Sequence, residues 1–440
     1  MSLLSLMYTS ISGLTATSDG ISVIGNNIAN LNTTGFKGSR TMFGDVYAKA
    51  IDNVGLGTVT QSITTQFSQG PIFSTGNPLD FAIQGEGFFI VKDSNTNKEY
   101  YTRAGEFSLN KDSIIINPDG LRLQGYIADD AGNISQTLSD IEILPKNTDG
   151  IPIMPGQSTS TAEIVFNLSG SPDETIYSSG TLLNPLDSTK GPQAGTYNYS
   201  IAMTVYDSEG RTHAVEIYFK KTGFTLGTGS TWDAHVIWNS GKTIPNYHEQ
   251  IINNLTFDTA GNMTSSGGPF SVNLTWDADD WDGDISTPPT TPAAQTVSMD
   301  FTGSTQYGSP YSTVFQKVNG YPEGGLTSFR MDKDGILYGL YSNGWDKKIA
   351  QLALARFNAP TELNRIGKNL FEETYGSGNR IIVTAGTGGG GNILSNSLEM
   401  SNIDLAEEFV TMMMLQKAYN ASSVALSTSI EMLKSWDNII

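Results

Sequence analysis

Apolar residues recur at a seven-residue spacing at both ends of the chain, and this pattern limits its possible folds more than any other feature. Near the C-terminus the spacing joins Leu405, Met412, Tyr419, Leu426, Leu433 and Ile440. Near the N-terminus it joins Met7, Leu14, Ile21 and Ile28, with Leu4 and Ile11 at the neighbouring position. A strict seven-residue apolar period is typical of helices that pack along a long seam. We therefore predict terminal helices over residues 1–30 and 400–440 that pair as a coiled coil.

The C-terminal helix carries signals for its first turn. Ser401 and Asn402 are candidate N-caps, and three carboxylates would lie near the positive end of the helix dipole: Asp404, Glu407 and Glu408.

The N-terminal helix is unusually poor in charge. Asp19 is the one charged residue among the first 36. A helix on the surface of a monomer usually has a charged face, so both faces of this helix are predicted to contact protein. Three glycines weaken the helix in isolation by roughly 1 kcal/mol each relative to alanine: Gly13, Gly20 and Gly25. The sequence pattern allows two interpretations, because the helices would either cover the chain's own β core or join subunits in a polymer.

Between the predicted helices, short apolar runs alternate with turn signals, as in β-rich domains. Phe88–Val91 and Ile114–Ile116 are predicted strands. Asp207–Gly210 lies between two such runs and predicts a hairpin, and Asp332–Gly335 is predicted to be a second hairpin turn.

Two proline-containing stretches, 151–156 and 287–292, mark predicted domain boundaries. With 440 residues, the chain is too long for one ordinary core. We predict a mainly β fold with α-helical termini and a nested, multi-domain order, in which two β-rich domains lie outside the helices. The predicted parts are a terminal helical domain (1–30 and 400–440), an extended connecting region (31–72 and 362–399), a first β domain (73–150 and 296–361) and an inserted outer β domain (151–295).

Composition excludes several classes of function. The formal net charge of −19 argues against nucleic acid or an anionic membrane as a partner, because both attract Lys and Arg. Cysteine is absent, which excludes thiol chemistry. Only three histidines occur, so few side chains of the kind that binds transition metals are present. Polar residues interrupt the N-terminal apolar pattern, so it predicts neither a cleaved signal peptide nor a membrane span.

Two further motifs carry little functional signal. Gly386–Gly391 fits a dinucleotide-binding pattern, but the helix that such a site requires does not follow directly. The acidic loop Asp277–Asp284 does not fit the ligand positions of an EF-hand, although another type of calcium site stays open. No local signature of catalysis is present, so we expect neither enzyme activity nor a cofactor.

The two chain ends resemble the paired signatures of a known family. Asn26–Asn30, followed by Thr34–Lys37, is similar to the N-terminal signature of bacterial flagellar rod and hook proteins. Ser401–Val410, followed by Gln416–Tyr419, resembles the matching C-terminal signature. Segments of the first β domain, such as Ala82–Phe89, extend the resemblance inward. The predicted subunit interface therefore comprises the residues of the two apolar ladders together with Asn26, Asn27, Asn30 and Phe409.

The resemblance implies a structural subunit of a helical homopolymer. The large insert favours a hook member of the family, whose tube acts as a universal joint, over the distal rod member. The implied partners are further copies of the chain, the flagellar rod, the hook cap, the hook-filament junction proteins and the export apparatus. The implied location is the extracellular flagellum, attached to the basal body and reached without signal-peptide cleavage. A secreted β-rich adhesin is the alternative from a different class.

Overall fold

The computed structural model describes residues 3–46, 56–147, 150–171, 173–183, 189–239, 246–265, 267–276 and 293–437. The chain forms two compact units. Unit 1 comprises Met1–Pro152, Thr327–Leu340 and Trp345–Ile440, and unit 2 comprises Ile153–Leu326 and Tyr341–Gly344. Unit 1 therefore includes both chain ends, and unit 2 is inserted into it.

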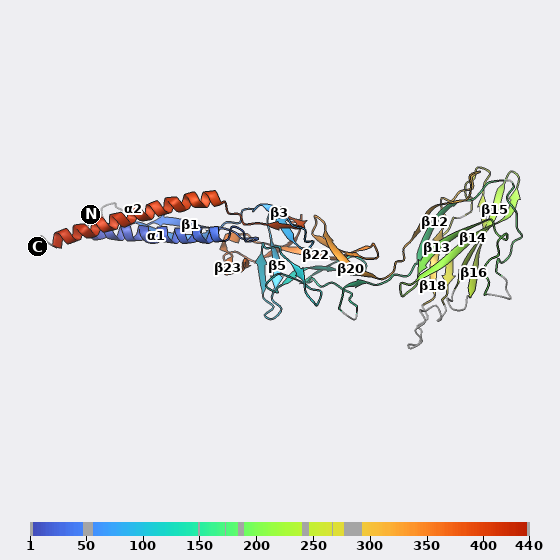
Figure 1. The fold of residues 1–440 in the computed structure, drawn as a ribbon, viewed down its shortest axis with the longest axis horizontal. Coiled ribbons are helices and arrows are strands. Elements are labelled where there is room, and N and C mark those ends of the chain that lie inside the picture. Colours follow the sequence, from blue (N-terminus) through green and yellow to red (C-terminus); the bar gives the residue numbers. More distant parts are fainter. Residues whose placement is uncertain are drawn as a thin grey trace. The chain divides into compact units, whose positions relative to one another are not determined.

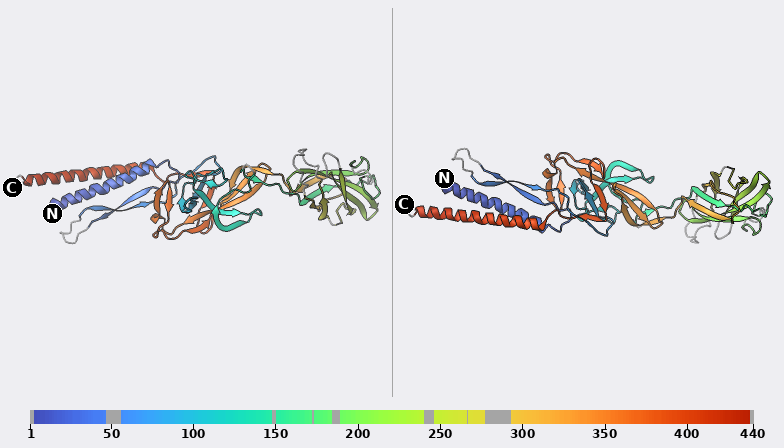
Figure 2. Two further views of the ribbon diagram at one scale, coloured as in Figure 1. Left: turned by 90° about the horizontal axis from the view of Figure 1, so that it is seen from below. Right: turned by 90° about the horizontal axis from the view of Figure 1, so that it is seen from above.

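Two long helices, α1 (Leu3–Ala29) and α2 (Leu405–Asp437), lie side by side in unit 1 and run in opposite directions (Figure 1). A hairpin of strands β1 (Ser39–Asp45) and β2 (Thr58–Thr65) lies along α1 (Figure 2). Hydrogen bonds join this hairpin to the helix, because Thr60 Oγ1 donates to Asp19 Oδ2 at 2.8 Å and the Thr58 amide donates to Ser12 Oγ at 3.2 Å. The prediction of two terminal helices is confirmed.

The β part of unit 1 is built around one large, mostly antiparallel sheet. Its aromatic core includes Phe88, Tyr101, Phe357 and Phe371, which contact one another edge-to-face. The short 3-10 helix η2 (Pro360–Glu362) precedes its last strands. Along the sheet the strands are β20 (Gly324–Met331), β21 (Ile336–Tyr341), β22 (Asp346–Arg356), β9 (Arg122–Ala128), β5 (Phe88–Lys92), β6 (Glu99–Thr102), β24 (Leu370–Glu372) and β23 (Asn364–Gly367), with β7 (Ser108–Leu109), β8 (Ile115–Ile116), β10 (Ile134–Asp140) and β25 (Ile381–Thr384) attached.

Two short ladders connect the chain before the sheet with the chain that leads to α2. Strand β3 (Ile72–Ser74) pairs with β27 (Ser397–Glu399). Strand β4 (Phe81–Gln84) pairs with β26 (Asn392–Ser395). These antiparallel pairs bring the N-terminal and C-terminal segments of unit 1 together next to the helix pair.

Unit 2 consists of two four-stranded sheets that share one core. Strand β13 (Tyr199–Tyr206) shows the alternating burial of a sheet with one buried face, and large side chains such as Trp232, Phe166 and Phe219 are fully buried. Strand β11 (Ile153–Met154) pairs with Gly324 and Gly325, which are residues of β20 that belong to unit 2. The sheets are β13 (Tyr199–Tyr206), β14 (Thr212–Thr225), β15 (Gly229–Asn239) and β16 (Tyr247–Phe257), and β17 (Phe270–Leu274), β18 (Gln295–Asp300), β12 (Thr161–Asn167) and β19 (Ser312–Val318).

The predicted limits of the insert differ from the limits of unit 2. The prediction ended the insert at residue 295, whereas unit 2 continues to Leu326. The reason is strand pairing, because β12 forms a parallel pair with β18 and an antiparallel pair with β19. The predicted connecting regions also contain regular strands, including the hairpin of β1 and β2.

Both predicted hairpin turns are present. Asp207 precedes the turn between β13 and β14, and its Oδ1 accepts hydrogen bonds from the amides of Glu209 and Arg211. In the turn between β20 and β21, Asp332 Oδ1 accepts hydrogen bonds from the amides of Asp334 and Ile336. Gly335 in this turn has a φ of 74°. A positive φ favours glycine because it lacks a Cβ atom.

No helix in the described part of the chain has the length and hydropathy of a membrane span.

Candidate assembly surface of the terminal helices

Two glycines of α1 lie directly against side chains of α2. A Cβ atom added at Gly13 would lie 2.9 Å from Ser422 Oγ, and one added at Gly20 would lie 2.8 Å from Leu415 Cδ1. Ser10, Ala16 and Ser429 are also buried in the helices. Two of the three glycines that weaken α1 in isolation, Gly13 and Gly20, are therefore residues that allow close approach of α2. Gly25 has no such neighbour, because a Cβ there would meet nothing within 4 Å.

Where α1 ends and α2 begins, a hydrogen bond joins the two helices at the next position of the same seven-residue spacing. Asn27 Nδ2 donates to Glu408 Oε1 at 2.9 Å. The contacts 13–422, 20–415 and 27–408 each move seven residues along both helices in opposite directions. The seven-residue period is thus present in the helix pair, but glycine and polar side chains occupy several of its central positions.

Asn27 also fixes the chain that leaves α1. Its amide nitrogen donates to the Ser39 carbonyl at 2.8 Å, and its amide oxygen accepts from the Ser39 amide at 3.0 Å. Only 3% of Asn27 is exposed, so these bonds satisfy a buried polar group. Burial raises the pKa of Glu408, the hydrogen bond from Asn27 opposes that effect, and the neighbouring charge of Glu407 adds to it.

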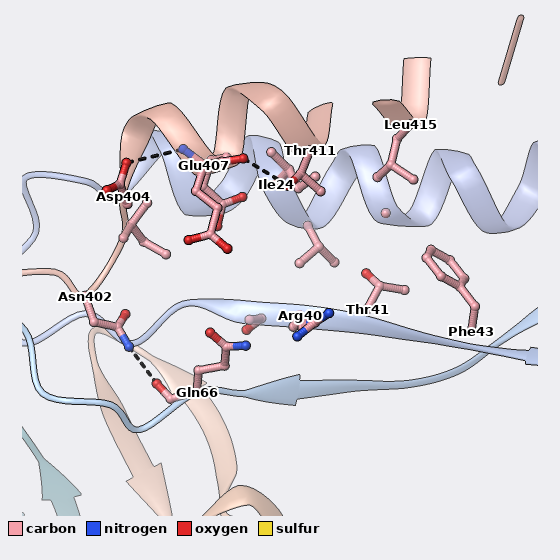
Figure 3. A pocket seen from close by; sticks show the side chains of 15 residues that line it. Ile24, Arg40, Thr41, Phe43, Gln66, Asn402, Asp404, Glu407, Thr411 and Leu415 are labelled. Carbon is pink, nitrogen blue, oxygen red and sulfur yellow. Dashed lines mark hydrogen bonds between the residues drawn. The ribbon is translucent and has the colours of Figure 1, made fainter. Parts of the chain in front are cut away.

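The start of α2 differs from the predicted capping. The cap is Asp404, whose Oδ1 accepts hydrogen bonds from the amides of Ala406 at 2.8 Å and Glu407 at 3.3 Å. Asn402 instead joins two other segments, since its Oδ1 accepts from the Gly38 amide and its Nδ2 donates to the Gln66 carbonyl (Figure 3). The assignment of Ser401 and Asn402 as N-caps was wrong because Asn402 satisfies backbone groups outside the helix.

A buried charge cluster lies where both helices join the β part of unit 1. Lys37 Nζ is 2.6 Å from Glu399 Oε1, and Arg103 Nη1 is 3.1 Å from Glu399 Oε2. The side chains of Lys37 and Glu399 are fully buried, and that of Arg103 is 4% exposed. Lys37 also donates to the Ser68 carbonyl at 2.7 Å, and the Gly70 amide donates to Glu399 Oε1 at 2.9 Å.

Electrostatics in this cluster combine burial with ion pairing. Burial lowers the pKa of Lys37, and the Glu399 carboxylate opposes that shift. Burial lowers the pKa of Arg103 as well, again against the attraction of Glu399. Glu399 therefore compensates the charges of two buried cations. Its contacts also link four segments of unit 1 that are distant in the sequence, namely its own and those of Lys37, Gly70 and Arg103.

The structure places the predicted interface residues in different environments. Asn27 is buried. The side chains of Leu4 and Ile440 are not among those that the structure describes. The half-buried residues are Met7, Leu14, Ile21, Ile28, Asn30, Met412, Leu426 and Leu433. The exposed residues are Ile11, Asn26, Leu405, Phe409 and Tyr419.

Further exposed apolar residues on the helices were not predicted, because they lie off the seven-residue spacing. Val410, Met413 and Met414 lie within five consecutive residues of α2 and are each at least 50% exposed. The exposed apolar surface of the pair, named here the helix surface, comprises Tyr8, Ile11, Leu405, Phe409, Val410, Met413, Met414, Tyr419, Val424, Ile430 and Met432. Monomeric proteins rarely expose a large apolar patch, so this surface is suited to contact another protein.

The glycine-rich motif does not have the surroundings of a dinucleotide site. Gly386–Gly391 connects β25 to the strand β26, and no helix begins there. Arg356 Nη1 donates to the Gly388 carbonyl at 2.9 Å, which ties this loop to β22. The acidic loop Asp277–Asp284 lies outside the described residues, and the described residues contain no group of three potential metal ligands.

Comparisons with family models cover most of the chain. Residues 179–321 match the flagellar basal body protein FlaE D2 domain, and residues 82–154 match the flagellar hook protein FlgE/F/G D1 domain. Residues 7–37 match the flagella basal body rod protein model. Residues 394–439 match the flagellar basal body rod FlgEFG protein C-terminal model.

Curated relatives match over nearly their whole length. The flagellar hook protein FlgE of Escherichia coli (strain K12) is 32% identical over 434 residues, which is 98% of both chains. FlgE of Treponema pallidum (strain Nichols) is 30% identical over 479 residues, which is 97% of both. The crystal structure of Helicobacter pylori flagellar hook protein FlgE2 aligns with a TM-score of 0.50 at 15% identity, over 74% of this chain and 100% of that one, and supports the fold.

Proposed function

The chain belongs to the flagellar hook protein FlgE family, and we propose that its helix surface joins subunits into the hook polymer. It is a structural subunit of the bacterial flagellar hook. Hook proteins are not known as enzymes. The comparisons support neither the distal rod protein nor a secreted adhesin as an alternative.

One observation carries the proposal. Gly13, Gly20 and Asn27 of α1 lie at contacts with α2, while the large apolar side chains of the helix surface are exposed. Phe409 is 47% exposed and Met414 is 57% exposed. Burial of such side chains against a second copy is favourable by about 25 cal/mol per Å² of apolar area. The proposed contact between subunits therefore gains most of its free energy by burying apolar side chains that are exposed to water in the isolated subunit.

The proposed polymer is a flexible tube that transmits torque from the rod to the filament. Its further partners are the rod, the hook cap, the hook-filament junction proteins and the export apparatus. We place it in the extracellular flagellum, where it is exported without signal-peptide cleavage. The apolar ladders, Asn26, Asn27, Asn30 and Phe409 contribute to the proposed interface directly or by fixing the helix ends.

A double substitution on the helix surface tests the proposal. Phe409→Ser combined with Met413→Ser should prevent tube formation by the purified chain, as seen by sedimentation and electron microscopy. Both side chains are about half exposed, so the thermal unfolding of the subunit should change little. The matched control is Leu226→Ser, which removes a 92% exposed apolar side chain from unit 2. Tubes that form at the unmodified chain's critical concentration in the double variant would contradict the proposal.

A further inference from the structure

Residues 177–183 of unit 2, named here the strap, lie on the face of the sheet of β13 to β16 that points away from the core. The Tyr177 amide donates to the Lys221 carbonyl on β14 at 2.8 Å, and the strap then runs across β15 to β16. It contains neither a helix nor a strand. Four of its seven residues are exposed, and Tyr177, Leu182 and Leu183 are half-buried. Because the strap buries little apolar surface, polar contacts hold it on the sheet.

The sheet face beneath the strap is charged and yet buried. Successive side chains of a strand point to opposite faces, so Asp233 and His235 lie on the face opposite Trp232 and Ala234 of the core. Asp233 is 2% exposed and His235 is 0% exposed. Lys220 on β14 pairs in register with Asp233 and is 6% exposed. Buried ionisable groups are unfavourable unless they are paired or hydrogen-bonded, and the strap supplies hydrogen bonds to this layer.

Glu249 on β16 binds the end of the strap. The Leu182 amide donates to its Oε1 at 2.8 Å, and the Leu183 amide donates to its Oε2 at 3.3 Å. His235 Nδ1 lies 2.6 Å from the same Oε1, and only 6% of the Glu249 side chain is exposed. His235 Nε2 is buried without a partner among the described residues. Both carboxylate oxygens of Glu249 are therefore bonded to the strap while it is in place.

Two more contacts of the strap go to ionisable side chains. Ser179 Oγ donates to Asp233 Oδ2 at 3.0 Å, and Lys220 Nζ donates to the Gly180 carbonyl at 3.2 Å. The contacts of residues 179–183 thus depend on charge, whereas a backbone hydrogen bond holds the start of the strap. Hydrogen bonds to an ionised carboxylate are stronger than those to a neutral one. Protonation of the carboxylates therefore weakens the strap at residues 179–183 and leaves its start in place.

The other ionisable groups of this layer do not release the strap by themselves. Lysine and tyrosine keep their protons in acid. A proton on His235 strengthens its attraction to the Glu249 carboxylate. Glu216 accepts its hydrogen bond from the Tyr218 hydroxyl. The ionisable groups of the strap and of the sheet face beneath it are Tyr177, Glu216, Tyr218, Lys220, Asp233, His235 and Glu249.

The direction of the pH effect follows from the contacts of Glu249. Burial acts to raise its pKa, but the hydrogen bonds from His235 and the two strap amides outweigh burial and hold the pKa below 4.5. When the strap leaves, Glu249 loses both amides, so its pKa rises towards the ordinary value. The carboxylate therefore stabilises the closed strap above pH 4.5, and this contribution is lost as the pH falls through the closed-state pKa.

We propose that the strap is an acid-released cover, which leaves the sheet at residues 179–183 when Glu249 takes up a proton, while both sheets of unit 2 remain folded. Release exposes the charged layer of Lys220, Asp233 and His235 to solvent. The inference concerns unit 2 alone and does not depend on assembly through the helix surface.

Cooperative unfolding of unit 2 in acid is the simpler account of the same groups. The strap and the sheets would then open together. The difference in burial favours separate opening, because the strap covers only part of Leu182 and Leu183 whereas the sheets enclose fully buried residues such as Trp232 and Val236. Segments with few buried apolar contacts open at lower free energy than the core.

Hydrogen exchange of the full-length chain, measured by mass spectrometry of its peptides, tests the inference. Protection is expressed relative to an unstructured peptide at the same pH. Protection of residues 179–183 should be constant from pH 7 to about pH 5 and should fall by up to about tenfold per pH unit below about pH 4.5, since one proton is linked to opening. The peptides of β14 and β15 should stay protected over this range. Equal loss of protection in strap and strands, or a strap that stays protected down to about pH 3.5, would overturn the inference.

Glu249→Gln moves the test to neutral pH. Glutamine has no negative charge and only one acceptor atom, so protection of residues 179–183 should fall by about tenfold at pH 7. The further fall below pH 4.5 should be smaller than in the unmodified chain. The matched control is Glu163→Gln, which changes an exposed carboxylate on β12 and should leave protection of the strap unchanged.

Ser179→Ala separates the pH response from the strength of attachment. It removes the hydrogen bond to Asp233 and should lower protection of the strap while the fall below pH 4.5 remains. Unchanged protection at pH 7 in Glu249→Gln, or the same fall in acid as in the unmodified chain, would exclude Glu249 as the responding group. Near-ultraviolet circular dichroism verifies that each variant is folded. If Glu249→Gln does not fold, the pH series of the unmodified chain decides.

Discussion

Gly20 has a structural role that no side chain can take over without displacing a neighbour. A Cβ atom at this position would lie 2.8 Å from Leu415 Cδ1 and 3.2 Å from Phe43 Cζ. Gly20→Val should therefore destabilise the helix pair by about 1–3 kcal/mol through overpacking. The midpoint of thermal unfolding, followed by far-ultraviolet circular dichroism, measures this loss.

Gly25→Val is the matched control because the same side chain meets open space at Gly25. Valine has a higher helix propensity than glycine, so this variant should be as stable as the unmodified chain or slightly more stable. Equal destabilisation by the two substitutions would show that close approach of α2 to Gly20 is not the cause of the loss.

Glu249 in unit 2 is a buried carboxylate held by several donors. Its Oε1 is 2.6 Å from His235 Nδ1 and accepts a hydrogen bond from the Leu182 amide at 2.8 Å. The Leu183 amide donates to Oε2 at 3.3 Å. Burial acts to raise the pKa of Glu249, but the bonds from His235 and the two amides outweigh it, so the pKa is below its ordinary value of 4.5.

This lowered pKa predicts loss of stability in acid. The folded state favours the carboxylate, so its contribution is present above pH 4.5 and is lost as the pH falls through the folded-state pKa. Glu249→Gln should lower the free energy of unfolding at pH 7 by about 2 kcal/mol, and the difference from the unmodified chain should shrink below about pH 4.5. Urea unfolding followed by tryptophan fluorescence at several pH values measures it.

Glu163→Gln provides the comparison for Glu249. Its side chain is exposed on β12 in the same unit. The substitution should change the free energy of unfolding by no more than about 0.5 kcal/mol at any of these pH values. A constant difference between Glu249→Gln and the unmodified chain from neutral pH down to about pH 3 would argue against the predicted role of the carboxylate.

At the scale of elements, the buried charge cluster holds the segments next to α1 and α2 on the β part of unit 1. Glu399→Leu would leave Lys37 and Arg103 buried without a counter-charge. Removal of one partner from a buried ion pair costs about 3–5 kcal/mol, and we expect a loss of this size in the free energy of unfolding of unit 1. Urea unfolding followed by circular dichroism measures it.

The exposed pair Arg330–Asp346 gives a matched comparison for the buried cluster. Its side chains are 49% and 47% exposed. Asp346→Leu should cost no more than about 1 kcal/mol, because solvent screens an exposed ion pair. If the two substitutions had equal effects, burial would not be the reason for the importance of Glu399.

Elements with local signals could be predicted from the sequence. Asp207–Gly210 and Asp332–Gly335 each contain the aspartate that accepts turn amides and the glycine that permits a positive φ. The period of seven likewise predicts both terminal helices, because the helical repeat is itself local.

Contacts between distant segments could not be predicted in the same way. The pairing of β12 with β18 joins residues more than 130 positions apart, and no local pattern marks it. The cluster of Lys37, Arg103 and Glu399 is equally non-local, since each residue alone resembles an ordinary surface charge. The contacts of Gly13 with Ser422 and of Gly20 with Leu415 fall outside the ladder positions, and Gly13 and Ser422 are small and carry no apolar signal.

At the scale of the whole molecule, the two units have separate hydrophobic cores. Trp232, Trp238 and Trp276 all belong to the core of unit 2 and make tryptophan fluorescence sensitive to its unfolding. Calorimetry of the subunit should therefore show two transitions, of which fluorescence follows mainly one. A multi-domain chain need not unfold in a single cooperative step.

The two destabilising substitutions should act on different transitions. Glu399→Leu lies in unit 1 and should lower the transition that circular dichroism of the helices reports, without moving the fluorescence midpoint. Glu249→Gln should do the reverse, and the double variant should show both shifts unchanged, because distant sites without shared partners contribute additively. Equal shifts of both transitions in either single variant would mean that the units unfold as one cooperative body. Separate transitions would instead show that the inserted unit retains its fold while the helices of unit 1 unfold.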